Sequence, residues 1–493
     1  MEPFILALDQ GTSSSRAIVF DQHAEPLASH SQAFQCRYPQ PGWVEADPEE
    51  LWQTQRASID GALQKAGIGT AKVTAIGLTN QRETVMAWDR STGAALTPAI
   101  VWQCRRTTDQ CQALRERGLE PQIRERTGLL LDPYFSATKM GWLLDSDPAL
   151  RRAAERGEAA FGTVDSWVIW RLSGGRSHLT DASNASRTLL FNLASGQWDP
   201  WLLECFGIPP ACLPHICDSA GILAHTDPAV IGAEVPICGI AGDQQAALFG
   251  QGCVHPGMAK NTYGTGCFLL LNTAGEIVRS SHGLLSTVAW RLNGRLSYAL
   301  EGSVFMAGAL IQWLRDELGI IDSAQQSEAL AASVPDSGGV HLVPAFTGLG
   351  APHWDPHARG MISGLTRGSN RAHIVRAAIE AVAWQNFDLL QAMQADTGNP
   401  LQELRVDGGM SQNNLLCQFQ ADVLQQRVSR AAQTESSALG AALLAGLGCS
   451  LWDFEQIDRL WRGDRQFDPT MSVAERDRQL AGWQQALRQV RHR

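Results

Sequence analysis

Short apolar runs alternate with stretches of helical periodicity along the chain. Phe4–Leu8 is an apolar run that leads into a loop of small polar residues, and Ala17–Phe20 is a second run after it. This pattern predicts two strands joined by a tight turn. Val73–Leu78 is a further predicted strand. Glu49–Gln64 has the apolar spacing of a helix, and Pro48 stands at its start.

The second half of the chain repeats this design. Met258–Tyr263 and Cys267–Leu271 are predicted strands on either side of a Gly-Thr-Gly turn. Further elements are predicted at 372–390 (helix), 403–406 (strand), 413–424 (helix) and 436–447 (helix). A strand, a Gly-Thr turn and a strand near the start of each half indicate a duplication, although such a short similarity also arises by chance. We therefore predict two α/β domains, residues 1–248 and 249–493, with a ligand cleft between two lobes.

Composition and charge exclude several classes of protein. The 493 residues carry a formal net charge of −10, which argues against general nucleic-acid binding but not against a phosphate ligand. The first ten residues, MEPFILALDQ, lack the basic segment of a signal peptide. The apolar stretch Ser436–Trp452 is interrupted by glycines, so we expect a buried helix and no membrane insertion. A cytoplasmic location is the expectation that follows.

Metal-binding and disulfide patterns are weak in this sequence. The 11 cysteines include no CxxC pair, which favours reduced thiols in the core over zinc or disulfides. His353 and His357 are four residues apart, as in some metal pairs. However, Pro352 and Pro356 argue against a regular helix there, and a surface loop is the stronger interpretation.

One aspartate is the strongest candidate for chemistry. Asp243 is the only charged residue between Val235 and Val254, and Gly239 and Gly242 precede it closely. A carboxylate in an apolar environment is costly unless it is used, so Asp243 is a candidate catalytic base. The alternative is a helix N-cap, because Gly-Asp-Gln-Gln before an alanine-rich run is a common start of a helix.

Three small-residue loops follow predicted strands and could hold phosphate. The first runs from Asp9 to Arg16 and contains Gly, Thr and three Ser. Its hydroxyls and cation suit phosphate oxygens, and Asp9 could hold Mg²⁺ through water. The other two are Gly264-Thr265-Gly266 and Asp407-Gly408-Gly409. Hairpins of Gly and Ser are common, so each loop alone is weak support, and only the set of three indicates nucleotide binding.

A polar cluster follows the predicted strand Val73–Leu78. Adjacent opposite charges, here Arg82 and Glu83, usually belong to a solvated loop. Together with Asp243, however, they would supply one donor group and two acceptors. That set suits a small polyol, whose hydroxyls both donate and accept hydrogen bonds.

Two long segments resemble the FGGY family of carbohydrate kinases. The first is Tyr134–Trp142 (YFSATKMGW), and the second is Gly360–Leu365 with its continuation to Glu380. Within the family, five segments are similar to the members that act on glycerol. They are TNQRET (79–84), AIVWQCRRT (99–107), NASRT (184–188), AGDQQAALFGQ (241–251) and KNTYGTGCF (260–268).

The resemblance implies a fold, a reaction and a set of residue roles. The fold is two actin-like, ribonuclease H-like lobes with ATP and Mg²⁺ between them, and the reaction is ATP-dependent phosphorylation of glycerol to sn-glycerol 3-phosphate. The implied glycerol contacts are Arg82, Glu83, Trp102, Tyr134, Asp243, Gln244 and Phe268, with Asp243 as the base. The implied nucleotide contacts are Thr12, Ser13, Ser14, Arg16, Thr265, Gly308, Gln312, Gly409 and Asn413, with Asp9 and Asp243 toward the metal. Members of the family commonly form homodimers or homotetramers, and we expect one of these here.

The chain departs from part of the family in one loop. Some bacterial members carry a glycine-rich loop ending in arginine that binds fructose 1,6-bisphosphate. In this chain Glu234 stands where that arginine would align, and a carboxylate repels phosphate. We therefore expect this form of inhibition to be absent.

Two other functions remain open at this point. One is a family kinase for another polyol or a ketose such as xylulose. The other is an ATPase related to actin or Hsp70, which would hydrolyse ATP without a polyol. The sequence shows no appended peptide-binding domain, and such an ATPase would leave Arg82, Glu83 and Asp243 unexplained.

Overall fold

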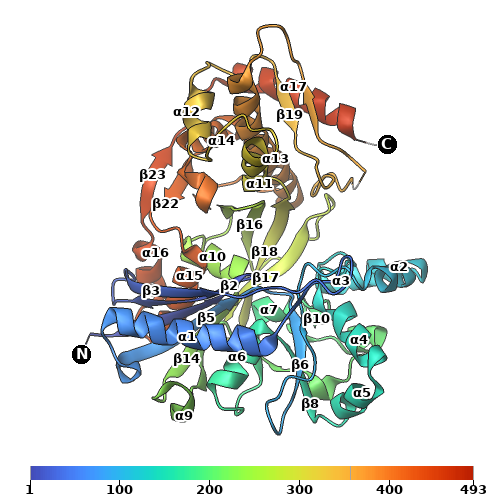
Figure 1. The fold of residues 1–493 in the computed structure, drawn as a ribbon, viewed down its shortest axis with the longest axis vertical. Coiled ribbons are helices and arrows are strands. Elements are labelled where there is room, and N and C mark those ends of the chain that lie inside the picture. The colour runs from blue at the N-terminus through green and yellow to red at the C-terminus, as the bar shows by residue number, and fades with distance from the viewer. Residues whose placement is uncertain (1, 356, 492–493) are drawn as a thin grey trace.

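The structure, a computed structural model, describes residues 2–355 and 357–491 and contains two α/β lobes, one above the other in Figure 1. The sheet of the N-terminal lobe runs in the order β13 (Ala220–His225), β14 (Pro236–Gly242), β5 (Val73–Asn80), β1 (Phe4–Gln10), β2 (Ser14–Phe20), β3 (Pro26–Ala33). The sheet of the C-terminal lobe runs in the order β17 (Leu285–Leu292), β18 (Arg295–Val304), β16 (Cys267–Ala274), β15 (Met258–Tyr263), β21 (Glu403–Asp407), β22 (Val428–Ala431), β23 (Gly463–Phe467).

The two sheets share one topology, as the predicted duplication requires. In the first, β1 pairs antiparallel with β2 and parallel with β5, which pairs parallel with β14. In the second, β15 pairs antiparallel with β16 and parallel with β21, which pairs parallel with β22. Each predicted Gly-Thr turn therefore connects the first two strands of its sheet. The predicted α/β class and both hairpins are confirmed.

Helices cover the sheets, and their ends follow local capping chemistry. The predicted helix at 49–64 is α1 (Pro48–Ala66): the Asp47 side chain accepts from the Glu49 N–H, and Gly67 ends the helix with φ of 68°. The later predicted helices are α13 (Arg371–Thr397), α14 (Asn414–Leu424) and α15 (Ser436–Gly448). The helix α13 extends beyond its prediction because Asn370 forms a capping box and Gly398 takes the left-handed conformation.

The remaining elements fill the lobes and their insertions. The other helices are α2 (Thr108–Glu116), α3 (Glu120–Thr127), α4 (Ser136–Ser146), α5 (Pro148–Glu155), α6 (Val164–Leu172), α7 (Ala182–Ala185), α8 (Pro200–Phe206), α9 (Pro228–Ile231), α10 (Asp243–Gly250), α11 (Gly308–Asp316), α12 (Gln326–Ala332), α16 (Phe454–Leu460) and α17 (Val473–Val490). A small sheet inserted in the N-terminal lobe contains β4 (Glu45–Ala46), β7 (Ala99–Ile100), β6 (Val85–Asp89) and β8 (Ala159–Thr163). Two-stranded pairs are β9 (Leu179–Asp181) with β12 (His215–Cys217), β10 (Phe191–Asn192) with β11 (Gln197–Trp198), and β19 (His341–Val343) with β20 (Met361–Ser363).

Two helices, α10 and α15, join the lobes where they meet in Figure 1. Although α15 comes late in the chain, it packs against β1, β5 and β14 of the N-terminal sheet as well as against α10. Glycines make this contact close. A Cβ on Gly440 would lie 1.8 Å from the Ala246 carbonyl oxygen, and one on Gly77 would lie 2.1 Å from the Ala441 carbonyl oxygen. The predicted boundary at residue 248 falls within α10, and it stays a prediction.

The structure also bears on the predictions for the apolar stretch from Ser436, for the cysteines and for the two histidines. The stretch from Ser436 contains α15, which is buried over most of its length, as predicted. Among the described residues, no helix is both long and apolar enough to cross a membrane. The cysteines are free thiols, and most of them are buried. His353 and His357 lie outside regular helix, as expected of a loop, while Pro356 lies outside the described residues.

The contact between α10 and α15 predicts whether one substitution stabilises or destabilises the protein. Alanine is favoured over glycine within helices by about 1 kcal/mol, so Gly440→Ala would stabilise a free helix. At this position the added Cβ meets a backbone carbonyl, and overpacking of this kind costs about 1–3 kcal/mol or more. We expect a lower melting temperature than that of the wild type. Gly275→Ala is the control, because its Cβ would meet nothing within 4 Å. A stabilised Gly440→Ala variant would contradict this packing.

Candidate active site

The first phosphate loop is the turn between β1 and β2. The Gly11 N–H donates to the Ser14 carbonyl at 2.9 Å, and the register places Asp9 opposite Arg16. The hairpin leaves Ser13 exposed and Thr12 and Ser14 partly exposed, so their hydroxyls can reach a ligand. Arg16 also forms an ion pair with Glu435, just before α15. The loop therefore exposes hydroxyl groups at its tip, and phosphate binding there stays a prediction.

The second loop, between β15 and β16, is held by the start of α11. Gly264 and Thr265 are exposed, and their carbonyls accept the first N–H groups of α11, including Gly308 N–H to Gly264 O at 2.9 Å. A Cβ on Gly308 would lie 2.6 Å from that same carbonyl, so glycine permits this contact. Gln312 is exposed about one turn further along α11.

The third loop follows β21. Gly408 has φ of 83°, and a Cβ there would lie 2.5 Å from the Tyr263 carbonyl, so this glycine packs the loop against the second hairpin. Next to it, a Cβ on Gly409 would meet nothing within 4 Å, which leaves open space beside the backbone. Asn413 accepts the Leu416 N–H as the N-cap of α14. Its position therefore has a structural explanation independent of nucleotide binding.

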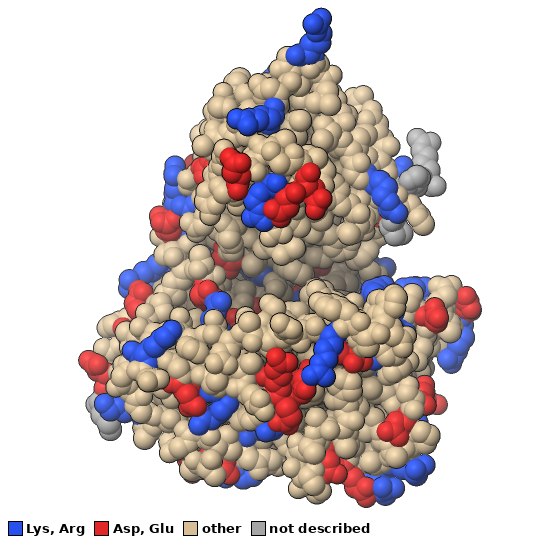
Figure 2. Space-filling view, in the orientation of Figure 1, with Lys and Arg blue, Asp and Glu red and all other residues tan. Residues whose placement is uncertain are grey.

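Asp243 lies between these loops, at the end of β14. It is the first residue of α10, and Gly242 occupies the N-cap, so the interpretation of Asp243 as only an N-cap is wrong. Its Oδ1 accepts the Gln244 N–H at 2.7 Å and lies 3.3 Å from Arg82 Nε. The side chain is 34% exposed. Figure 2 shows the surface hollowed between the two lobes. Burial raises its pKa, Arg82 opposes the shift, and Glu83 adds to it.

The residues from Asn80 to Glu83 are not a solvated loop. Arg82 and Glu83 are at most 2% exposed, because Arg82 forms a two-point ion pair with Glu301 of β18. Arg187 joins the same group, donating to Glu83 Oε1 and to Glu301 Oε1 at 2.9 Å each. Two arginines of the N-terminal lobe thus face a glutamate of the C-terminal lobe. We call Arg82, Glu83, Arg187 and Glu301 the buried ion cluster.

Aromatic side chains stand beside the ion cluster. The rings of Trp102 and Tyr134 are perpendicular, with centroids 5.4 Å apart, and Tyr134 Oη is 3.4 Å from Arg82 Nη2. Trp102 Nε1 donates to Thr12 Oγ1 at 3.0 Å, which connects this wall to the first phosphate loop. Phe268 lies on β16, two residues beyond the second loop, and is partly exposed.

Two carboxylates at this site fit a divalent cation. Burial and the nearby Asp243 raise the pKa of Asp9 to about 7, against the opposing effect of Arg16. Carboxylates that repel each other in this way gain from a shared cation. No group of three or more metal-ligating side chains exists among the described residues. The pair therefore suits Mg²⁺, which keeps several waters and binds through one or two carboxylates plus phosphate.

Residues missed by the sequence reasoning complete the site. Glu301 and Lys260 are both buried. Glu301 is the only charged residue between Leu296 and Leu314, which is the signal that identified Asp243. Lys260 stands among polar residues in β15 and carries no such signal. The partners of Glu301, Arg82 and Arg187, are 219 and 114 residues away along the chain and could not be read from local sequence.

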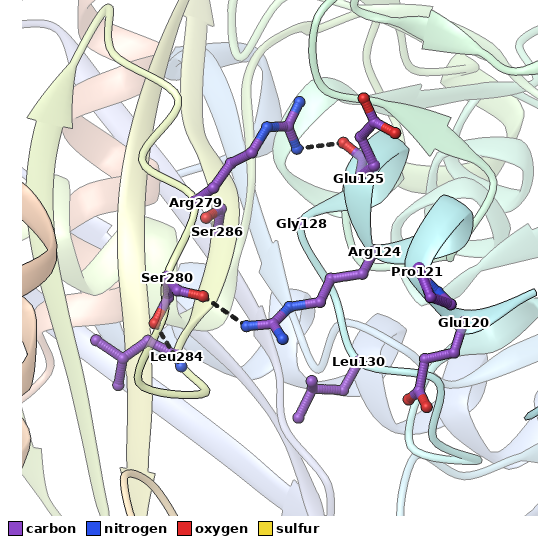
Figure 3. A pocket seen from close by; sticks show the side chains of 10 residues that line it. All are labelled: Glu120, Pro121, Arg124, Glu125, Gly128, Leu130, Arg279, Ser280, Leu284 and Ser286. Atoms are coloured by element: carbon purple, nitrogen blue, oxygen red, sulfur yellow. Dashed lines mark hydrogen bonds between the residues drawn. The ribbon is translucent and has the colours of Figure 1, made fainter.

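A separate cavity of about 550 Å³ lies at the edge of the lobe contact (Figure 3). Arg124 Nη2 donates to the Ser280 carbonyl at 2.6 Å, and Arg279 Nη1 donates to the Glu125 carbonyl. The arginines therefore connect α3 to the segment before β17. Glutamates line the same cavity, so its charges balance and it offers no anion site comparable to the loops above.

The ion cluster predicts a pH-dependent contribution to stability. Burial acts to raise the pKa of Glu301, but Arg187 and Arg82 outweigh it and lower that pKa from 4.5 to about 2. The stabilisation is therefore complete above pH 4.5 and is lost as the pH falls from 4.5 toward 2. Glu301→Gln should lose about 3–5 kcal/mol at pH 7, because it leaves buried arginines unpaired. Its melting temperature should also fall less than that of the wild type between pH 5 and pH 3.

Glu455→Gln is the matched control, since it breaks an exposed ion pair with Arg459. Such pairs contribute about 0–1 kcal/mol. An equal acid sensitivity of wild type and Glu301→Gln would contradict the assignment.

Comparison with known proteins agrees with this geometry. Residues 4–250 match the N-terminal domain, and residues 259–449 the C-terminal domain, of the FGGY family of carbohydrate kinases. Proteins named glycerol kinase from Aromatoleum aromaticum and Dechloromonas aromatica are each 56% identical, over 99% and 100% of this chain and 99% and 98% of theirs. The crystal structure of Plasmodium falciparum glycerol kinase with ADP superposes with a TM-score of 0.95, at 34% identity, covering 100% of this chain and 99% of that one. The xylulose kinase of Rhodospirillum rubrum gives a TM-score of 0.87, at 25% identity, over 99% and 98% of the two chains. The chain belongs to the FGGY family of carbohydrate kinases.

Proposed function

We propose that this chain transfers the γ-phosphoryl group of ATP to glycerol, giving sn-glycerol 3-phosphate and ADP. The observation that carries the proposal is the Asp243 carboxylate, open to the cleft between the phosphate loops and held next to Arg82. Relatives named glycerol kinase, 52–56% identical over nearly the whole chain, support glycerol as the acceptor. The alternative is a family kinase for another polyol or ketose.

Glycerol has six heavy atoms, so almost every hydroxyl must be bonded. At best about −1.5 kcal/mol per atom is available to such a small ligand. Glu83 and Asp243 would accept from hydroxyls, and Trp102, Tyr134 and Phe268 would enclose the carbon chain. These contacts rest on the family resemblance and on the closeness of most of the side chains to Arg82.

Protein groups already engage the guanidinium group of Arg82, which limits how it can bind glycerol. Its Nη1 and Nη2 donate to Glu301, and its Nε lies 3.3 Å from Asp243 Oδ1. Of the hydrogen bonds that Arg82 donates, the two longest run to Tyr134 Oη at 3.4 Å and Gln245 Oε1 at 3.3 Å. A glycerol hydroxyl that accepts from Arg82 would therefore replace one of these two, while the ion pair with Glu301 stays formed.

The reaction requires one proton transfer and one exchange of bonds at phosphorus. The hydroxyl oxygen forms a bond to the γ-phosphorus, the bond from that phosphorus to the ADP oxygen breaks, and the hydroxyl proton passes to Asp243. A carboxylate is too weak a base to deprotonate the alcohol beforehand, but it can orient the hydroxyl and accept the proton late in a loose transition state. When bound, Mg²⁺ would neutralise charge on the phosphate oxygens. The hydroxyls and backbone amides of the two hairpins would bind the same oxygens.

The proposal also covers how this enzyme is regulated, where it is located and how it assembles. Glu234 is exposed just before β14, and a carboxylate there supports insensitivity to fructose 1,6-bisphosphate. The family resemblance supports an enzyme of the cytoplasm that forms a homodimer or a homotetramer.

Substrate choice can be tested in one coupled assay. ADP release is measured with Mg-ATP and, in turn, glycerol, glycerone, xylulose or no acceptor. We expect kcat/KM for glycerol to exceed that for each other acceptor, because glycerone lacks a hydroxyl at its middle carbon and xylulose is larger than glycerol. A preference for xylulose would move the proposal to the alternative, and equal rates without acceptor would favour an ATPase.

The role of Asp243 predicts the effect of a single substitution. Asp243→Asn keeps the size and removes the base, so we expect kcat to fall about 10²–10⁴-fold, the usual size of a general-base effect. The melting temperature is measured in parallel to show that the variant is folded. The control is Asp458→Asn, which removes a carboxylate from an exposed contact with His255 and should keep kcat within about twofold. A near-normal kcat for Asp243→Asn would exclude Asp243 as the base.

A further inference from the structure

Lys260 is a buried cation that the proposed reaction leaves unexplained. It lies on β15, the first strand of the C-terminal sheet, and its exposed fraction is 0%. Burying an ammonium group costs free energy unless it gains partners. A methionine would fill the same space without this cost, so packing does not explain a lysine at this position.

The partners of Lys260 point across the lobe contact to the glycerol site. Its Nζ donates to Gln244 Oε1 on α10, and to Thr262 Oγ1 on its own strand at 3.1 Å. Gln244 in turn donates its backbone N–H to Asp243 Oδ1. The lysine is therefore connected through one residue to the candidate base.

Carboxylates near Lys260 favour its protonated form. Burial lowers its pKa to about 8, while Asp407, Asp243 and Glu301 oppose that shift. Asp407 has a buried Oδ1 without a hydrogen-bond partner, so a nearby cation offsets its cost as well. Carboxylates of both lobes therefore favour the charged form of Lys260.

The chemistry of the ammonium group fixes the orientation of the Gln244 amide. A lysine has three donors and no acceptor, so it can pair only with the amide oxygen of glutamine. The amide nitrogen is then directed elsewhere, and among the described residues no protein acceptor pairs with Gln244 Nε2. Gln244 is partly exposed, so this N–H₂ group is available as a donor.

We propose that Lys260 is a positioning residue that holds the Gln244 side chain with its N–H₂ group toward the acceptor substrate. The inference rests on the proposed function and adds a specific role to it. Asp243 and Glu83 can only accept hydrogen bonds from hydroxyls when ionised. A correctly oriented Gln244 supplies a donor to a hydroxyl oxygen, which a polyol needs in addition.

A double-mutant cycle tests this role. The variants are Lys260→Met, Gln244→Ala and the double variant, and the quantity is kcat/KM for glycerol with saturating Mg-ATP. We expect Lys260→Met to lower kcat/KM about tenfold, mainly through a higher KM, because the bond to substrate exists before reaction. In the Gln244→Ala background the same change should cost less than about threefold, since the group that Lys260 orients is gone.

Lys139→Met is the matched control for the loss of a buried ammonium group that does not contact Gln244. Lys139 is equally buried, and burial likewise lowers its pKa, to about 7, but it donates to the backbone carbonyls of Trp102 and Tyr134. Its effect should combine additively with that of Gln244→Ala. If Lys260→Met does not fold, Lys260→Arg takes its place in the cycle, because a longer, branched donor also misplaces the amide.

Additive effects of Lys260 and Gln244 would overturn the proposal, even if each variant is impaired. A wild-type enzyme without turnover on glycerol would instead overturn the proposed function, and the role of Lys260 with it. The two failures are distinguished by the wild-type rate alone.

Discussion

The ion pair between Arg82 and Glu301 is the contact on which the site depends. It joins the segment after β5 in the N-terminal lobe to β18 in the C-terminal lobe, and both side chains are buried away from water. Charges in such a place interact strongly, and an unpaired one is costly. The cluster therefore fixes Arg82, and Arg82 in turn fixes the Asp243 carboxylate. A site for a small polyol needs this precision, because so few contacts are available to bind it.

The same constraint explains why the lobes share a packed junction instead of a simple linker. The glycines between α10 and α15 bring a late helix onto the early sheet, so the two halves of a duplicated chain form one site. The phosphate loops then belong to different lobes, while the ion cluster lies at their contact. We expect the lobes to close on glycerol, since water left in the site would hydrolyse ATP.

Local sequence predicted the elements well where the signal was local. Alternating apolar runs predicted both hairpins. The isolated charge pointed to Asp243, which lies beside Arg82, and its role as the base stays a prediction. Arg82 and Glu83 were harder, because adjacent opposite charges usually lie in solvent, and only their partners far along the chain explain their burial. Glu301 and Arg187 were missed for that reason, because their pairings join distant parts of the chain that no short window of sequence contains. Lys260 was missed because its polar neighbours in β15 give no local signal, although Gln244 is only 16 residues away.

If this protein phosphorylates glycerol, cleavage of ATP in the cleft is coupled to formation of the phosphate ester. This coupling is tested by following ADP and glycerol 3-phosphate together, in purified protein with Mg-ATP, with and without glycerol. We expect negligible ADP release without glycerol and one glycerol 3-phosphate per ADP with it. ADP release that is independent of glycerol, or unaccompanied by the phosphate ester, would contradict the coupling.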